Sequence, residues 1–350
     1  MPDDFKRPGL PLAVVAQPAK RQRMDVVAAG GGPQSSIPRT SNLQAPIMLL
    51  QGHEGEIYAG RFSPDGSCLA SAGFDMKIFL WNVYGDCENF SVIPGHTGAI
   101  MQLAFTTDSG ILISCSTDRT VRTWDMTTGA CVRKLKGHTS FVNAVEVARR
   151  GPPIMCSGSD DGSVRVWDPR QRNATHTLQS TYQVTAVTFN DTADSVISGG
   201  IDNELKMWDL RKVAEAYRMP GHVDTVTGLA LSPDGCHVLS NSMDLTARIW
   251  DVRPFAPQQR CVKLMSGHAH NFEKACERAN LLRCGWSPDG HRVTCGSADR
   301  YVYVWEVNTR RIMYKLPGHQ GSVNQTDFHP NEPILLSAGS DKKIYLGEIQ

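Results

Sequence analysis

The chain has 350 residues, a formal net charge of +1, ten cysteines and 41% hydrophobic residues. So small a net charge gives no general case for non-specific nucleic-acid binding, which needs clustered positive charge. No apolar run approaches the roughly 20 residues of a membrane span, and no Cys-x-x-Cys pair occurs. We therefore expect an intracellular protein with free thiols and no membrane contact.

Residues 1–44 are rich in Pro, Gly, Gln and Ser and show little apolar periodicity, which predicts a disordered basic N-terminal tail. A short basic cluster lies inside it, at Lys20, Arg21 and Arg23. Nuclear-import receptors read clusters of this kind, but a solvated run of charge has the same letters, so both interpretations stay open.

From residue 45 to residue 350 one pattern returns about every 40 residues, the period of repeats that build propeller blades. The clearest copy runs from Cys156 to Asp168, where Asp161-Gly162 separates an apolar run from a strictly alternating one. Two antiparallel strands joined by a tight turn have this pattern. One such hairpin cannot bury both of its faces, so we expect the copies to stack on one another.

Four polar or aromatic side chains recur in each full unit: a histidine, a serine, an aspartate and a tryptophan. A catalytic triad is needed once, in a cleft, so near-copies in every unit argue for a structural role. We therefore expect no enzyme activity and no cofactor. In the first three units the recurring residues are His53, Ser71, Asp75 and Trp81; His96, Ser114, Asp118 and Trp124; and His138, Ser157, Asp161 and Trp167.

Over residues 45–350 the Gly-His pairs, the turn aspartates and the Trp-Asp endings resemble those of the WD-repeat family. The resemblance implies an all-β fold, a seven-bladed WD40 β-propeller, in which the four recurring side chains form a buried hydrogen-bonded tetrad. Units four, six and seven each lack one member of the tetrad, at Ser180, Cys295 and Gly347. We expect these three blades to be softer than the others.

The last unit is one strand short, because the chain stops at Gln350 just after the third strand of that unit, Lys343 to Glu348. The segment from Ile47 to Leu50 precedes the first Gly-His pair and can supply the missing outer strand. Pairing of the first strand with the last blade would close the ring and remove its open sheet edges, so we expect no homo-oligomer.

Alternation along the inner strands should turn several large apolar side chains toward one mouth of the central channel. Exposed apolar clusters mark protein-binding sites, whereas packing between blades is the competing explanation. The candidate partner-binding residues at this mouth are Tyr58, Phe74, Met101, Phe141 and Met243.

Arginines gather in the loops that should form the opposite rim. They are either ordinary solvated charge or a basic docking rim for an acidic or RNA-bearing partner, with a peripheral RNA contact. The candidates on this rim are Arg149, Arg150, Arg170, Arg211 and Arg253.

Unit six carries extra residues within 269–280, where Asn271 could cap a short helix. Histidines and cysteines near this insert invite a comparison with zinc sites, but their spacing matches no common one, so we expect no metal. These residues are His268, His270, Cys276 and Cys284.

Stretches that blade geometry does not dictate resemble one branch of the family, the WD-repeat subunits of the U5 small nuclear ribonucleoprotein. They include LQAPIMLLQGHEGEIY from Leu43, WDVRPFAP from Trp250 and the terminal GEIQ. The resemblance implies a nuclear, non-catalytic scaffold that acts in pre-mRNA splicing in the spliceosome. Its implied partners are the large central scaffold protein of the U5 particle, with the GTPase and helicase subunits nearby.

A second function stays open at this point. Arg170, Arg211 and Arg253 each complete a Trp-Asp-x-Arg box, which is typical of substrate receptors of cullin-RING ubiquitin ligases. Many WD-repeat proteins carry the same box, so the box alone does not decide between the two functions.

Overall fold

The structure, a computed structural model, describes residues 39–257, 259–269 and 281–349. The predicted import cluster of Lys20, Arg21 and Arg23 and the predicted helix near Asn271 lie outside the described residues. Within the described ranges every regular element is a β-strand, and the 28 strands form seven four-stranded antiparallel sheets. The predicted seven-bladed propeller is therefore confirmed.

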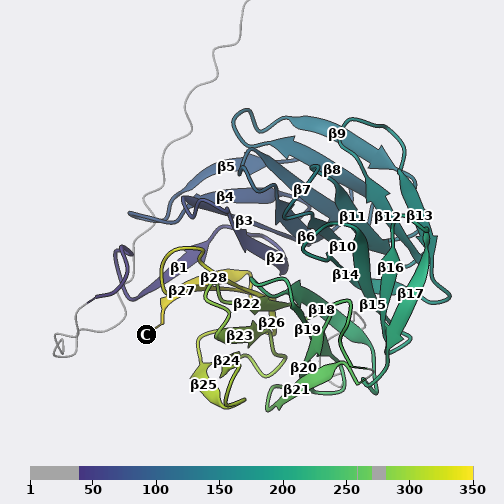
Figure 1. Ribbon diagram of the computed structural model, residues 1–350. Helices are drawn as coiled ribbons and strands as arrows, with labels where there is room; N and C mark the ends of the chain where they lie inside the picture. Colours follow the sequence, from purple (N-terminus) through teal and green to yellow (C-terminus); the bar gives the residue numbers. More distant parts are fainter. Residues whose placement is uncertain (1–38, 258, 270–280, 350) are drawn as a thin grey trace, which may run out of the picture. The chain divides into compact units, whose positions relative to one another are not determined.

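Each blade contributes one strand to each of four concentric positions (Figure 1). The inner strands are β2 (Ile57–Phe62), β6 (Ile100–Phe105), β10 (Val142–Val147), β14 (Val184–Phe189), β18 (Val226–Leu231), β22 (Cys284–Trp286) and β26 (Val323–Phe328). The second strands are β3 (Cys68–Gly73), β7 (Ile111–Ser116), β11 (Met155–Ser159), β15 (Ser195–Gly200), β19 (His237–Ser242), β23 (Arg292–Cys295) and β27 (Ile334–Gly339).

The third strands are β4 (Ile78–Asn82), β8 (Thr120–Asp125), β12 (Ser163–Trp167), β16 (Leu205–Asp209), β20 (Thr246–Asp251), β24 (Val302–Glu306) and β28 (Lys343–Glu348). The outer strands are β5 (Asn89–Ile93), β9 (Cys131–Lys136), β13 (His176–Gln179), β17 (Ala214–Met219), β21 (Cys261–Ser266), β25 (Ile312–Leu316) and β1 (Ile47–Gln51). Blades are numbered one to seven from the inner strands β2 to β26.

Burial follows the position of a strand in its blade. The inner strand β14 is buried at all six positions, because it lies between neighbouring blades, whereas the outer strand β1 alternates between exposed and buried residues. The inner strands of successive blades contact one another, and β2 contacts β26, so the ring closes. Its core consists of the apolar layers between blades.

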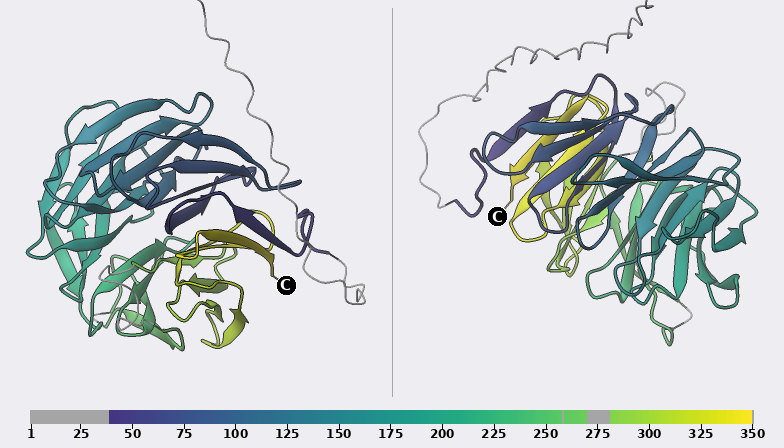
Figure 2. Two further views of the ribbon diagram at one scale, coloured as in Figure 1. Left: turned by 180° about the vertical axis from the view of Figure 1, so that it is seen from behind. Right: turned by 90° about the horizontal axis from the view of Figure 1, so that it is seen from above.

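The closing strand pairs as predicted: β1 lies antiparallel to β28, with Met48 opposite Leu346. In Figure 2 the purple strand β1 runs beside the yellow strands of blade seven. The contacts begin upstream of the expected tail boundary at residue 44, since the Thr40 and Ser41 N–H groups both donate to Glu348. The segment before β1 is thus part of the closure.

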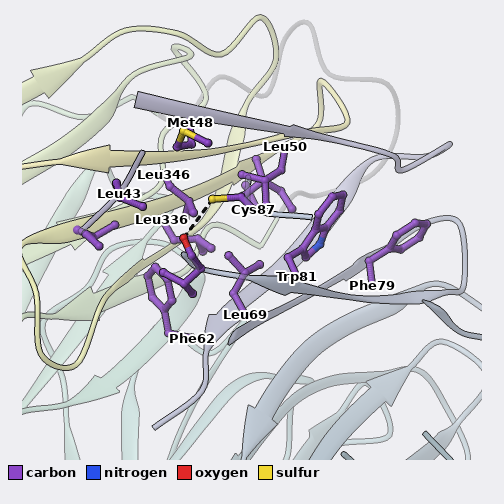
Figure 3. Close-up of a cluster of buried hydrophobic side chains, with 14 of the residues drawn as sticks. Leu43, Met48, Leu50, Phe62, Leu69, Phe79, Trp81, Cys87, Leu336 and Leu346 are labelled. Atoms are coloured by element: carbon purple, nitrogen blue, oxygen red, sulfur yellow. Dashed lines mark hydrogen bonds between the residues drawn. The ribbon is translucent and has the colours of Figure 1, made fainter. Parts of the chain in front are cut away.

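A single apolar cluster joins the two ends of the ring (Figure 3). Leu43, Met48 and Leu50 come from the N-terminal segment, and each is at most 7% exposed. They pack with Leu336 and Leu346 of blade seven, and the cluster continues into blade one. The closing strand is therefore held by core packing as well as by its backbone hydrogen bonds.

The order of strands fixes two ends of the ring. We call the end that carries the Gly-His pairs and the turn aspartates the upper face. We call the opposite end, where inner strands finish in loops such as 63–67, the lower face. Every inner strand runs from the upper face to the lower face, so residues early in these strands lie near the upper mouth of the channel.

Candidate partner-binding surfaces

The four recurring side chains of blade one come together as a hydrogen-bonded tetrad. His53 Nδ1 lies 2.6 Å from Asp75 Oδ2, and His53 Nε2 lies 2.7 Å from Ser71 Oγ. The Trp81 indole N–H donates to the same serine oxygen at 2.8 Å. Ser71 is fully buried, so no substrate can reach it. The arrangement ties the turn to the strands and offers no nucleophile to solvent.

The same tetrad forms in three further blades. Burial raises the pKa of Asp118, but hydrogen bonds from His96 and Thr120 outweigh it and hold that pKa well below its ordinary value. Burial also lowers the pKa of His96, so this tetrad pairs a carboxylate with a neutral imidazole at pH 7. The other members are Ser114 and Trp124; His138, Ser157, Asp161 and Trp167; and His222, Ser240, Asp244 and Trp250.

Blade four replaces the missing histidine with a lysine that the sequence analysis did not single out. Lys206 Nζ donates to Ser180 Oγ at 3.0 Å and pairs with Asp202 at 2.5 Å, and its side chain is only 5% exposed. Trp208 still donates to Ser198 at 2.8 Å. The sequence feature that would have identified Lys206 is its position, four residues after the turn aspartate in the one unit without a Gly-His pair.

Blade six also replaces its missing partner. Cys295 stands where other blades have the serine, and Trp305 donates instead to the backbone oxygen of Ser266 at 3.2 Å. The Tyr303 hydroxyl donates to Asp299 at 2.6 Å, and its ring stacks on Trp305.

In blade seven, His319 keeps its contacts with Asp341 at 3.0 Å and Ser337 at 2.8 Å. Tyr345 packs edge-on against the imidazole, with the ring centroids 4.7 Å apart. Tyr345 thus makes an edge-on contact with the histidine in a blade without the tryptophan. That blades four, six and seven are softer stays a prediction.

At the upper mouth the five predicted apolar residues separate into two groups. Phe74 and Phe141 are exposed, by 46% and 49%. Tyr58 is buried and donates to Glu56 at 2.9 Å, and Met101 packs against a core cluster between blades. Met243 is half-buried. Only the two phenylalanines are therefore well presented to a partner, because the inner-strand positions of Tyr58 and Met101 face neighbouring blades.

Further exposed apolar residues lie at the same end, outside the five candidates of the sequence analysis. Together with Phe141 they run across blades three, four and five, next to the Gly-His pairs and turn aspartates. In the sequence these residues can be found by their position beside the Gly-His pairs and turn aspartates, whereas alternation along the inner strands does not reveal them. We call the set the upper arc: Phe141, Tyr182, Ile201, Val223 and Leu245.

One member of the upper arc is held in a backbone conformation that suits it poorly. The residue after each turn aspartate is left-handed in all seven blades, and in blade five it is Leu245, with φ 64°. Gly162 and Asn203 occupy the same place in blades three and four, and glycine and asparagine both tolerate the left-handed backbone conformation well. Leu245 instead presents a large apolar side chain to solvent at a conformational cost.

Below the upper mouth a buried arginine crosses the channel. Arg283 of blade six donates at 3.1 Å to the backbone oxygens of both Thr185 and Thr227, and at 2.5 Å to that of Asn143. Burial lowers its pKa to about 10, so it stays charged at pH 7. These contacts link blade six to blades three, four and five. Because extra residues precede Arg283 in unit six, its position relative to the inner strands of the other units could not be read from the sequence.

The predicted basic rim is at the lower face, but the side chains of four of its five arginines have carboxylate or backbone partners. Arg150 pairs with Asp191 at 3.1 Å, Arg211 with Asp194 at 3.4 Å, and Arg253 with Asp251 at 2.5 Å. Arg149 donates to the backbone oxygens of Leu231 and Ser232, whereas Arg170 is exposed and its backbone N–H donates to Asp168 at 2.8 Å. Acidic and basic groups alternate here, so the rim is not uniformly positive.

The geometry of the described residues gives no support for a zinc site. His268 and Cys284 are buried, and His270 and Cys276 lie outside the described residues. Over the described ranges no group of three or more His, Cys, Asp or Glu side chains is placed to hold a metal ion. The nine described cysteines are free thiols, and no helix of the described chain is long and apolar enough to cross a membrane.

Comparison with known proteins agrees with this architecture. The family model "WD domain, G-beta repeat" matches seven segments, 44–82, 87–125, 129–168, 172–209, 214–251, 259–306 and 310–346. The U5 small nuclear ribonucleoprotein 40 kDa protein of Bos taurus is 58% identical over 99% of this chain and 98% of its own length. Its Dictyostelium discoideum counterpart is 48% identical over 95% of this chain and 94% of its own length.

A more distant relative is the pre-mRNA-splicing factor cwf17 of Schizosaccharomyces pombe, which is 43% identical over 90% of this chain and 91% of its own length. The three relatives are similar to the whole propeller and not to single repeats. The chain belongs to the WD-repeat family and, within it, to the family of U5 small nuclear ribonucleoprotein 40 kDa proteins.

Proposed function

We propose that this protein is a non-catalytic scaffold of the U5 small nuclear ribonucleoprotein and acts in pre-mRNA splicing in the nucleus. The observation that carries the proposal is the 58% identity to a U5 40 kDa protein over nearly the full length of both chains. An alignment that covers 99% of the chain includes the loops as well as the strands.

The geometry supports a scaffold in place of an enzyme. The serine, histidine and aspartate groups that resemble a triad recur around the ring and are buried in structural tetrads. The surfaces open to other molecules are the two faces and the outer strands. A ring with two faces can hold several proteins at once, which suits a subunit inside a large particle.

For the partners, we propose the large central scaffold protein of the U5 particle as the main contact, with its GTPase and helicase subunits nearby. The upper arc is the surface we assign to a protein partner, since Phe141, Tyr182 and Val223 expose large apolar area on consecutive blades. Phe74 of blade one is exposed at the same end of the ring.

The test is incorporation of the tagged chain into the particle. The protein is expressed with an affinity tag in its own cells, purified from nuclear extract, and the U5 RNA that accompanies it is measured by quantitative reverse transcription. We expect U5 RNA to be enriched over other small nuclear RNAs, with U5 proteins in the same gradient fraction. Purification without U5 RNA would overturn the proposal.

The upper arc is tested in the same assay with two matched variants. Phe141→Ser combined with Tyr182→Ser removes two arc residues that are 49% and 56% exposed. Val132→Ser combined with Val262→Ser removes two outer-strand residues of similar exposure, 52% and 48%. We expect the first variant to recover several-fold less U5 RNA and the second to match the wild type. Equal recovery would remove the arc from the interface.

The N-terminal tail up to residue 38 is proposed to serve nuclear import and not folding, since residues from Thr40 onward already contact the ring. Its basic cluster of Lys20, Arg21 and Arg23 is the segment an import receptor would read. Changing the three residues to alanine should move a fluorescent fusion of the full chain from the nucleus toward the cytoplasm. Unchanged nuclear signal would show that import does not depend on the cluster.

A further inference from the structure

A cavity of about 470 Å³ opens on the lower face, where the inner strands end. It has the size of small-ligand sites in proteins. The side chains that form its ring come from the last or next-to-last residue of the inner strands, and six blades contribute to its wall. The ring residues are Arg61, Glu146, Thr188, Ala230, Trp286 and Asp327.

The ring holds two carboxylates and one guanidinium. Arg61 of blade one lies between the acids, with Nη2 2.9 Å from Glu146 Oε2 and Nη1 3.5 Å from Asp327 Oδ1. In the described part of the chain Arg61 is the only cation within ion-pair distance of either acid. Arg149 lines the same cavity, but both of its Nη atoms donate to the backbone oxygens of Leu231 and Ser232.

Each carboxylate oxygen in the ring is reached by a hydrogen-bond donor, and two of these four contacts are long, so the oxygens keep lone pairs for further donors. Glu146 Oε1 accepts only a long 3.4 Å bond, from the N–H of Val147, among the described residues. Asp327 accepts a 3.1 Å bond from the Phe62 N–H and has a long contact to Arg61, and the backbone of Phe328 also interacts with it. Burial raises the pKa of Asp327, and the positive charge of Arg61 offsets this effect only in part.

Part of the remaining wall is formed by flat apolar side chains. Trp286 is fixed by a 3.1 Å hydrogen bond from its indole N–H to the backbone oxygen of Ala230. Phe189 and Phe328 line the same cavity, with prolines around the opening. Flat aromatic and proline surfaces suit the methylene stem and the planar head of an arginine side chain.

We propose that the lower cavity receives an arginine side chain from a partner protein, with its guanidinium beside Arg61 on the open lone pairs of Glu146 and Asp327 and its stem against Trp286. A guanidinium offers several donors in one plane, which fits two carboxylates on separate sides of a ring better than the compact ammonium of lysine does. A phosphate backbone is disfavoured here because it would meet two carboxylates. This inference goes beyond the scaffold assignment and does not depend on it.

The first experiment uses the full chain alone and a small probe. The protein is labelled with ¹⁵N, the Trp286 indole signal is assigned with Trp286→Phe, and N-acetyl-arginine methylamide is titrated in. We expect a saturable shift of that signal, and none with the isosteric but uncharged citrulline analogue. The absence of a shift, or equal shifts with both compounds, would overturn the proposal.

Two double variants test whether the shift of the Trp286 signal comes from binding at the ring. Glu146→Gln combined with Asp327→Asn neutralises the ring and should weaken binding by about tenfold or more, as expected for the loss of charge-assisted hydrogen bonds. Asp86→Asn combined with Glu88→Gln removes the same charge from an exposed lower-face loop and should leave binding unchanged. If the first variant fails to fold, Ala230→Leu narrows the cavity with all charges kept and should also weaken binding. Wild-type affinity in the folded cavity variant would contradict the site.

The second experiment identifies the occupant in the assembled particle. A photo-reactive benzoylphenylalanine replaces Pro288 at the opening of the cavity, and the tagged chain is irradiated after purification from nuclear extract. We expect cross-links to a protein segment that contains an arginine, lost when Glu146 and Asp327 are neutralised. Cross-links to RNA alone, or no cross-link at the opening, would contradict an arginine-bearing protein partner.

Discussion

Met48 in the first strand lies directly opposite Leu346 in the last one, so the two ends of the chain complete a single sheet. Both side chains are buried in one cluster, together with Leu43 and Leu50. The stability of the whole ring therefore depends on a strand of five residues that precedes the first repeat.

Deleting residues 1–38 should leave the melting temperature unchanged, whereas deleting residues 1–52 should unfold the ring or lower its melting temperature greatly. The longer deletion exposes the partners of Leu43, Met48 and Leu50 and costs roughly 5–9 kcal/mol by area alone. That is comparable to the whole stability of a typical domain. Thermal unfolding followed by circular dichroism gives the comparison, and equal melting temperatures would contradict the closure.

A point-mutant pair separates core packing from strand pairing. Leu50→Ala empties a position that is 3% exposed and should cost about 2–5 kcal/mol. Leu49→Ala changes the neighbouring residue, which is 46% exposed, and should cost far less. Similar losses for both variants would mean that β1 is held by its backbone and not by its side chains.

Lys206→Met should destabilise the protein by about 3–5 kcal/mol, because it leaves Asp202 buried without its positive partner. Adding Asp202→Asn to the same chain should recover most of the loss, since neither buried charge then remains. Unfolding in urea at pH 7 measures both. Lys212→Met, on an exposed loop, is the control and should be close to wild type. A double variant as unstable as the single one would contradict the pairing.

Acidification should weaken the fold between about pH 6.5 and pH 4 through His268. Burial lowers the pKa of this histidine from 6.5 to about 4. The unfolded chain therefore binds a proton in this window that the folded chain excludes, and stability falls as the pH falls. The full loss is roughly 3 kcal/mol. Above pH 6.5 the contribution is complete.

The measurement is the free energy of unfolding in urea at several pH values. His268→Gln should flatten the slope between pH 6.5 and pH 4 by nearly one proton. His291→Gln, at an exposed histidine, should keep the wild-type slope. An unaltered slope in the His268 variant would assign the acid sensitivity to other groups.

Leu245→Asn should raise the melting temperature and at the same time reduce recovery of U5 RNA. The left-handed backbone at this position, with φ 64°, costs a leucine about 1 kcal/mol or more relative to residues that tolerate it. Asparagine already fills the equivalent turn at Asn203. A variant that is more stable and also binds as well as the wild type would show that Leu245 has no part in the interface.

The repeated letters alone determined the architecture. Seven turn aspartates at a nearly constant period define seven blades, and a last unit one strand short requires the segment around Met48 to close the ring. Both inferences need only local hydrogen-bonding rules and the need to bury both faces of each hairpin. The tetrads followed from the family resemblance for the same reason, since their members stand at fixed distances along the chain.

Only the tertiary structure decided which side chains meet across blades. Strand alternation places Tyr58 and Met101 on the channel side, yet neighbouring blades cover them. Tyr182 and Leu245 are exposed because they lie in loops at the end of the ring. Arg61 meets Glu146 across an intervening blade, and Arg283 reaches three other blades. Such contacts depend on how sheets far apart in sequence are rotated about a common axis, which no local pattern encodes.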